Sequence, residues 1–192
     1  MKHVGTNTIK TERLILRRFK LDDADVMYRN WASDDEVTRY MRWATHKDVE
    51  VSRNVMQQWV DSYKEDSSYH WGICLSDGEL IGSIGAFVTE IDYSASMGYC
   101  LGRKWWGKGY VSEALKAVID YLFANTDIER IEAYHAVRNA ASGKVMQNAG
   151  MAYEGLARHK FKSREGFEDS DLYGIIREMW EEQYEYELEG AK

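Results

Sequence analysis

The spacing of apolar residues changes along this chain of 192 residues. After one short apolar run at residues 14–19, apolar positions recur every three or four residues up to about residue 65, which indicates amphipathic helices. From residue 69 they gather in runs rich in β-branched and aromatic residues, which indicates strands. Beyond residue 102 the two patterns alternate. This order predicts a mixed α/β fold that is neither a doubly wound sheet nor a barrel.

The patterns predict a central sheet of about seven strands with flanking helices. The strands are expected at residues 14–19, 69–75, 80–89, 93–101, 128–137, 151–162 and 168–177. The helices are expected at about 22–31, in a short restart at 33–35, at 46–65, 110–124 and 139–149, with a short helix or tail over acidic residues 178–189. No repeat or low-complexity segment divides the chain, so residues 1–192 are expected to form a single domain with its core at about 11–180.

Polar residues and one glycine mark where predicted helices begin and end. Asp22 and Asp23 are expected to cap the first helix. Thr45 with Asp48 resembles a capping box, with Asp in place of the usual Glu, and so predicts the start of the long third helix. Gly150 stands where a left-handed C-cap is expected after the last long helix.

Composition narrows the classes of function. The net charge is −7 and no dense run of Lys and Arg occurs, which disfavours direct binding of nucleic acid. The acidic balance instead favours a cationic substrate. Cys74 and Cys100 fit no metal-binding spacing, so no metal is expected and both thiols are expected to be reduced. The N-terminus lacks the apolar stretch of a signal peptide, and no window approaches the ~18 apolar residues of a membrane span, so a cytoplasmic protein without a membrane partner is expected.

Two glycines, Gly107 and Gly109, stand between a predicted strand and a predicted helix. Without side chains they let the backbone approach a ligand, and the first amides of the helix attract an anion. Lys104 and Lys108 add positive charge, so a pyrophosphate is the expected ligand. The patterns GxxxxGK[ST] and GxGxxG are both absent. The remaining GxG pair also fits a plain strand-to-helix turn, and it leaves a nucleotide-phosphate binder open.

Residues around this loop carry a wider resemblance. The run Lys104-Trp105-Trp106-Gly107-Lys108-Gly109 matches the form [RQ]-x-x-G-x-[GA] except for Lys at its first position. Further matching runs are residues 11–17, 97–101, 106–115, 139–151 and 153–155. Over roughly residues 11–180 the chain resembles the GNAT superfamily of acyl-CoA transferases, in the branch that contains ribosomal-protein N-terminal acetyltransferases.

The resemblance implies a sheet that splays between its fourth and fifth strands, with acetyl-CoA as co-substrate. The loop amides would hold the CoA pyrophosphate. The pantetheine arm would pair with the fourth strand, where a backbone N–H near Cys100 or Leu101 would hold the thioester oxygen. The residues expected to bind acetyl-CoA are Tyr99, Cys100, Leu101, Lys104, Trp106, Gly107, Lys108, Gly109, Tyr110, Val111, Asn139, Ser142 and Lys144. Cys100 also fits a small core residue, and Lys144 also fits an exposed helix lysine.

Three residues are expected to take part in catalysis. The resemblance implies that Asn139 hydrogen-bonds the pantetheine arm and that Ser142 protonates the departing thiolate, although both also fit the first positions of a helix. No carboxylate lies centrally in residues 93–101. His135 is therefore the candidate general base, because an imidazole exchanges protons near neutral pH. A core histidine is the alternative reading of His135, and Glu154 or water are the alternative bases.

The acceptor stays open at this point. The resemblance places the acceptor site at the N-terminal helices, whose aromatic residues are Trp31, Tyr40, Trp43, Trp59 and Tyr69. Core packing is the alternative for most of them. Acidic residues that would attract a cationic amine are Asp34, Asp35, Glu36, Asp92 and Glu165, and solvated loop charge is their alternative.

The expected reaction is transfer of an acetyl group from acetyl-CoA to a primary amine. The amine is the N-terminus of a ribosomal or other protein, or a small molecule such as an amino acid, a polyamine or an aminoglycoside. A non-catalytic CoA-binding protein is the rival interpretation. Dimers are common in this branch, so a homodimer is one of the open oligomeric states.

Overall fold

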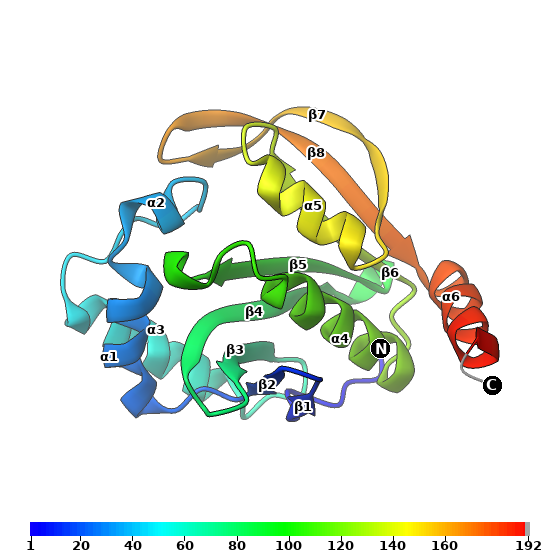
Figure 1. Cartoon of the computed structure of the whole chain (residues 1–192), viewed down its shortest axis with the longest axis horizontal. Coiled ribbons are helices and arrows are strands. Elements are labelled where there is room, and N and C mark those ends of the chain that lie inside the picture. Colours follow the sequence, from blue (N-terminus) through cyan, green and yellow to red (C-terminus); the bar gives the residue numbers. More distant parts are fainter. Residues whose placement is uncertain (191–192) are drawn as a thin grey trace.

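The computed structural model describes residues 1–190 and contains an open sheet of eight strands, in the order β1-β2-β3-β4-β5-β6-β8-β7 (Figure 1). The strands are β1 (Ile9–Lys10), β2 (Leu14–Arg17), β3 (Tyr69–Leu75), β4 (Leu80–Thr89), β5 (Ser94–Leu101), β6 (Arg130–Ala136), β7 (Ala152–Ser163) and β8 (Gly166–Ile176). Every neighbouring pair is antiparallel except β5–β6. The predicted mixed, mostly antiparallel sheet is confirmed. The added strand β1 has two residues, too few to show a hydrophobic period.

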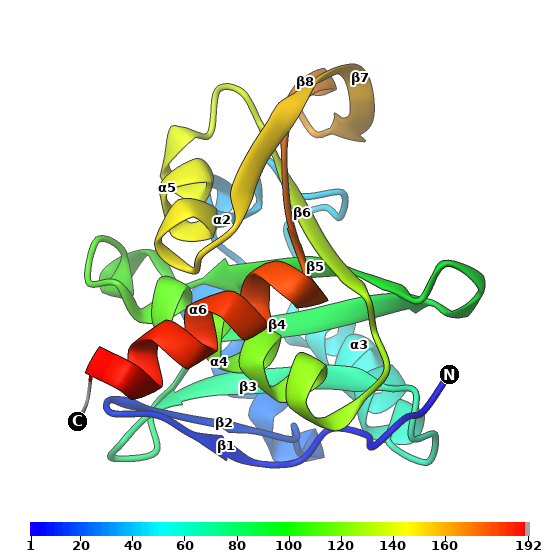
Figure 2. The ribbon, with the colours of Figure 1, turned by 90° about the vertical axis from the view of Figure 1, so that its right-hand side faces the viewer.

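Helices cover both faces of this sheet. They are α1 (Ala24–Met27), α2 (Asp35–Thr38), α3 (Val49–Ser62), α4 (Tyr110–Asn125), α5 (Ala140–Asn148) and α6 (Arg177–Gly190). Short 3₁₀ or π turns extend or link them at Leu21–Asp23, Tyr28–Ala32, Glu90–Asp92 and Arg103–Trp105. Figure 2 shows α4 and α6 in front of the sheet and α3 behind it. The acidic segment expected as a helix or tail is the helix α6.

The helix starts follow the predicted acidic residues with one correction. Asp23 acts from inside the first turn, where its carboxylate accepts a hydrogen bond of 2.8 Å from the Lys20 amide. The predicted capping box at Thr45 is wrong. Asp48 itself is the N-cap of α3, because its extended backbone lets its carboxylate accept from the two amides that follow Val49. Thr45 instead donates to Asp35 at 2.5 Å.

Side chains of β2, β3, β4 and β5 are divided between two hydrophobic clusters, one on each face of the sheet. Met97 and Leu101 of β5 belong to the larger cluster, which packs against α4 and α5. Cys100, between them in β5, belongs to the second cluster, which packs against α1 and α3. Trp31 and Tyr69, two of the predicted acceptor-site aromatics, are almost fully buried in these clusters. Core packing is therefore the role that the structure gives those two rings.

The sheet opens between β5 and β6. These parallel strands pair at three positions only, where Ser94–Ser96 lies beside Arg130–Glu132. Beyond them β5 stays paired with β4 as far as Leu101, while β6 stays paired with β8 as far as Ala136. This confirms the splay predicted between the fourth and fifth predicted strands. We call the opening between residues 97–101 of β5 and 133–136 of β6 the split; Figure 1 shows β7, β8 and α5 above it and β1–β4 below.

Within residues 1–190, no helix combines the length and the apolar character that crossing a membrane requires.

Candidate active site

The glycine loop directly precedes α4. Gly107 has φ +72° and Gly109 has φ +78°, the left-handed region that costs other residues about 1–2 kcal/mol. A Cβ on Gly107 would meet no atom within 4 Å, so the backbone there is open to a ligand. Gly109 is the N-cap of the 16-residue helix α4, and no side chain caps its first amides. Uncapped amides and the helix dipole would attract an anion to this end of α4.

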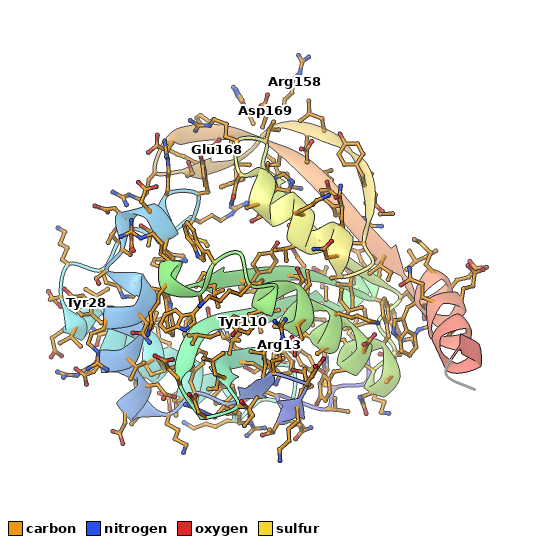
Figure 3. The ribbon with its side chains drawn as sticks, viewed as in Figure 1. Arg13, Tyr28, Tyr110, Arg158, Glu168 and Asp169 are labelled. Carbon is orange, nitrogen blue, oxygen red and sulfur yellow. The ribbon has the colours of Figure 1, made fainter. Side chains whose placement is uncertain are left out.

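Arg13 holds this loop in place, and sequence reasoning missed its role. Its Nη1 donates to the Lys108 carbonyl at 2.9 Å, and its Nε donates to a Glu113 carboxylate oxygen at 2.6 Å. The guanidinium also lies 4.8 Å from the ring centre of Tyr110 (Figure 3). The loop is thus braced from the start of β2, on a segment 95 residues away in sequence. The resemblance at residues 11–17 was the one signal that pointed to this region.

Glu113 completes the brace from inside α4. Its Oε1 accepts 2.6 Å from the Thr11 hydroxyl and 2.9 Å from the Arg13 amide. Burial works to raise the pKa of this carboxyl, but the hydrogen bonds from Thr11 and Arg13 outweigh it, and the pKa lies below its ordinary value. The carboxylate therefore stays charged and keeps Arg13 beside the loop.

A groove opens beside this end of α4. Its lining includes Thr11, Arg13, Gly109, Ser112, Glu113, Lys116 and Asn148, so it runs between the start of β2 and the facing sides of α4 and α5. An anion at the first amides of α4 would lie at one end of this groove.

The other predicted loop residues lie in different surroundings. Lys104 is 3.4 Å from Glu79 and lies over the ring of Trp105 at 4.9 Å, so its charge is directed toward the turn before β4. Trp106 donates from its indole to the Leu101 carbonyl at 2.7 Å. Lys108 and the predicted Lys144 are exposed, and Val111 is half-buried against the larger cluster. The ligand contacts of these side chains remain predictions.

The β5 side of the split offers backbone groups. Gly102 donates to the Ile81 carbonyl at 2.9 Å, so in an antiparallel ladder Cys100 also directs its N–H toward β4. The N–H groups of Tyr99 and Leu101 then point toward the split. Of the two amides predicted to hold a thioester oxygen, Leu101 has the required direction and Cys100 does not.

The Cys100 side chain belongs to the core. Its Sγ lies 3.3 Å from the Ser83 hydroxyl, and burial raises the pKa of the thiol to about 11. The thiol therefore stays protonated at neutral pH and is not a nucleophile.

Three predicted residues meet where α5 begins. Tyr99 donates from its hydroxyl to the Ser142 carbonyl at 3.2 Å, which joins β5 to α5. Burial raises the pKa of Tyr99, so the phenol keeps the proton that it donates. Asn139 precedes α5 but makes no side-chain cap. Its Nδ2 donates instead to the Ser142 hydroxyl oxygen at 3.1 Å, which leaves the hydroxyl hydrogen to be donated elsewhere.

His135 lies beneath the first turn of α5, with Nε2 beside Gly143 and 3.9 Å from an Asp171 carboxylate oxygen. The residue is 6% exposed, and its Nδ1 is 2.8 Å from the Ala136 carbonyl, so Nδ1 carries the proton and Nε2 is the basic atom. Nε2 faces α5: a Cβ on Gly143 would lie 2.6 Å from it. The structure gives His135 the surroundings of a core histidine packed under α5.

Glu154, the alternative base, is engaged as well. Arg130 donates to it from both terminal nitrogens, one of them at 2.8 Å, and these hydrogen bonds lower the pKa of Glu154. A carboxylate bound in this way is a weak base.

Most of the acidic residues expected to attract a cationic amine are neutralised by arginines. Arg103 pairs with Asp34 at 3.0 Å and Arg164 with Asp35 at 2.6 Å. Arg39 lies within 4 Å of both Glu36 and Glu165. Only Asp92 of that set has no arginine partner among residues 1–190. The net charge of the chain predicts an acidic surface around the acceptor site, but the arginines that pair with these carboxylates cancel most of that negative charge.

No group of three His, Cys, Asp or Glu side chains in the described part of the chain is arranged to hold a metal ion.

Comparison with known proteins identifies the family. The profile of the acetyltransferase (GNAT) domain matches residues 13–152. An uncharacterized N-acetyltransferase, p20, of Bacillus licheniformis is 36% identical over 172 residues, which cover 88% of this chain and 96% of the relative. The [ribosomal protein uS5]-alanine N-acetyltransferase of Escherichia coli is 31% identical over 99 residues, about half of each chain (50% and 51%).

A solved structure, RimL, the ribosomal L7/L12 alpha-N-protein acetyltransferase in complex with coenzyme A, has the same fold. Its TM-score is 0.80 at 19% identity, over 88% of this chain and 98% of RimL. The family match covers the glycine loop, the split and the start of α5. This chain therefore belongs to the GNAT family of acetyltransferases and is an N-acetyltransferase.

Proposed function

We propose that this enzyme transfers the acetyl group of acetyl-CoA directly to the primary α-amine of a ribosomal or other protein. The observation that carries the proposal is the meeting of Tyr99, Asn139 and Ser142 at the split, next to the uncapped start of α4. Support for a protein acceptor comes from relatives that act on ribosomal proteins uS5 and L7/L12. Small-molecule amines are the alternative acceptors.

The donor is bound by backbone groups in this proposal. The amides at Gly107–Val111 hold the pyrophosphate of CoA, with Lys108 beside them. The pantetheine arm lies along the edge of β5 that faces the split and pairs with Tyr99 and Leu101. This pairing brings the thioester to the Leu101 amide and to the Ser142 hydroxyl, and it requires no metal.

The enzyme accelerates this reaction mainly by aligning the amine with the thioester carbon, because a thioester is already activated toward attack. The amine nitrogen attacks the thioester carbon, a C–N bond forms, and the Leu101 N–H stabilises the charge on the carbonyl oxygen. When the C–S bond breaks, the Ser142 hydroxyl donates its proton to the CoA sulfur, and its oxygen regains a proton through the water that takes one from the amine nitrogen. Water takes the proton from the amine nitrogen, since His135 faces α5 and Glu154 is bound to Arg130.

The test is an acetyl-CoA-dependent thiol-release assay with a panel of amines. Peptides with N-terminal Ala or Ser, amino acids, polyamines and aminoglycosides are compared, and the product is located by mass spectrometry. Acetylation of a peptide α-amine is the expected result. Acetylation of small amines but of no peptide would show that the acceptor is a small molecule and not a protein. No turnover with any amine would overturn the proposal.

A thermal-shift comparison tests the donor separately. Acetyl-CoA at 100 times its dissociation constant would stabilise the protein by about 2.7 kcal/mol, and ATP at the same concentration would not. Equal stabilisation by ATP would show a general nucleotide-phosphate site in place of a CoA site.

A further inference from the structure

Two cations share one aromatic ring on the rim of the split. Arg42 donates from Nη2 to the Tyr134 hydroxyl at 2.7 Å, and its guanidinium lies 5.7 Å from the centre of the Tyr134 ring. Lys160 of β7 lies 5.4 Å from the same ring. Phe161, which is 7% exposed, backs the tyrosine at 5.6 Å and the arginine at 5.3 Å. Two segments far apart in sequence, one with Arg42 and one with Lys160 and Phe161, thus converge on Tyr134 of β6.

This cluster lies on the face of the sheet that α4 and α5 leave open. Ile131 and Ala133 of β6 are buried in the cluster shared with α4, and His135 contacts α5. Because strand side chains alternate, Tyr134 points to the opposite face. It also stands two residues beyond Glu132, the last β6 residue that pairs with β5, and so it lies at the edge of the split. A donor held at the start of α4 occupies one face, which leaves this face for the acceptor.

Arg42 and Lys160 have no counter-charge among the side chains that the structure describes. Within residues 1–183 neither has a carboxylate within 4 Å. The neighbouring cations are paired: Arg138 with Glu168 at 2.7 Å, and Arg164 with Asp35 at 2.6 Å. In a chain of net charge −7, two adjacent cations without counter-charge, both held against one ring, form a binding site for an anion.

We propose that the acceptor is an amine that carries a carboxylate or a phosphate, held by Arg42 and Lys160 against Tyr134. An acidic segment just after a protein N-terminus provides such a group, and so does a small amine phosphate. This inference rests on the proposed function, whose acceptor class it narrows. It reverses the expectation of a cationic substrate that the net charge suggests, because local charge at the split, and not the sum over the chain, faces the acceptor.

The experiment compares matched acceptors. One pair of peptides shares an N-terminal Ala and differs in the next two residues, Asp-Glu against Asn-Gln. A second pair is phosphoethanolamine against ethanolamine. With wild-type enzyme, kcat/KM is expected to be at least tenfold higher for the anionic member of one pair, and the ratio is expected to shrink as salt rises. Equal kcat/KM within both pairs would overturn the inference. A preference in the peptide pair alone would identify a carboxylate of a protein segment as the anion, and a preference in the ethanolamine pair alone would identify the phosphate of a small amine.

Variants of Arg42 and Lys160 test whether these two side chains cause the preference for an anionic acceptor. R42Q and K160Q are each expected to lower kcat/KM for the anionic acceptor about tenfold and to leave the neutral acceptor within about twofold. R42E is expected to reverse the preference toward a peptide with Lys-Lys at the same positions. K10Q is the matched control, because Lys10 is an exposed cation in β1 at the opposite edge of the sheet. A fall that is equal for both acceptors, or equal in K10Q, would overturn the inference. K160Q keeps the test valid if an Arg42 variant folds poorly, because Lys160 is exposed.

Direct binding separates this inference from the proposed function. Fluorescence anisotropy of labelled acidic and neutral peptides is measured with wild-type enzyme and R42Q in the presence of CoA. If the acidic peptide binds wild-type enzyme but not R42Q, and no amine is acetylated, the anion site is supported and the proposed acetyl transfer is overturned. Acetylation without any charge preference would retain the proposed function and overturn the anion site.

Discussion

On the α4 side of the split, the groups that would bind a ligand are backbone amides within one short segment, Gly107–Val111. On the opposite side they are the side chains of Arg42, Tyr134 and Lys160, which come from three separate segments. The first kind of site depends on a backbone conformation, and many side chains around it are exchangeable. The second depends on side-chain identity and on how the β7–β8 hairpin and the α2–α3 segment pack together. A donor common to a family suits the first kind, and an acceptor that differs between enzymes suits the second.

The largest expected effect is at Ser142, where the two sides meet. Ser142→Ala removes the proposed proton donor to the CoA sulfur, so kcat is expected to fall on the order of 10²-fold while the dissociation constant for acetyl-CoA stays unchanged. Steady-state kinetics and calorimetry measure the two quantities. Ser142→Thr, which keeps a hydroxyl, is the rescue variant. Wild-type turnover in Ser142→Ala at saturating substrate would remove Ser142 from the mechanism.

The next effect tests whether the donor site is made of backbone. Gly107→Val places a β-branched side chain at φ +72° and beside the proposed pyrophosphate, so affinity for acetyl-CoA is expected to fall about 100-fold. Gly78→Val is the matched control, because Gly78 also has a positive φ (+94°) and open surroundings, in the turn between β3 and β4. Both variants are expected to lose similar unfolding free energy. Equal acetyl-CoA affinity in the two would contradict the backbone site.

A smaller effect is expected at the brace that holds the loop. Arg13→Gln loses the charged hydrogen bonds to Lys108 and Glu113, and affinity for acetyl-CoA is expected to fall about tenfold, since such bonds contribute about 1.5–3 kcal/mol. Arg53→Gln is the control: the Arg53 side chain has a similar exposed fraction (48% against 45%) and pairs with Glu50 of α3 and Asp25 of α1. Titration calorimetry compares the two. An equal loss in both variants would show that Arg13 acts through global stability and not through the loop.

The smallest expected effect concerns the base. His135→Gln is expected to leave the pH dependence of kcat/KM unchanged, because His135 is buried with Nε2 packed against Gly143 and near Asp171. Stability measured by denaturant unfolding is expected to fall, since the residue is buried. Loss of a titration near neutral pH from the rate profile of the variant would restore His135 as the general base.

The strands and long helices could be predicted from the sequence because their signals are local. Residues 69–75 and 80–89 alternate or cluster apolar side chains over their whole length, and the structure has strands at those bounds. Signals that depend on one polar residue were weaker. Thr45 resembled a cap, yet its hydroxyl bonds Asp35, a partner ten positions away in sequence.

The sequence by itself determined the fold class and the glycine loop, since periodicity and glycine positions are local features of contiguous segments, and its resemblance to a family implied the splayed sheet. Only the tertiary structure decided what surrounds the loop and the split. It placed Arg13 on the loop, turned Lys104 toward Glu79 and packed His135 under α5. It also left Arg42 and Lys160 without counter-charge among the described side chains, which the net charge of the chain does not reveal. The physical reason is that the strength of an interaction between charges depends on distance in space, and the distance between residues far apart in sequence is set by folding.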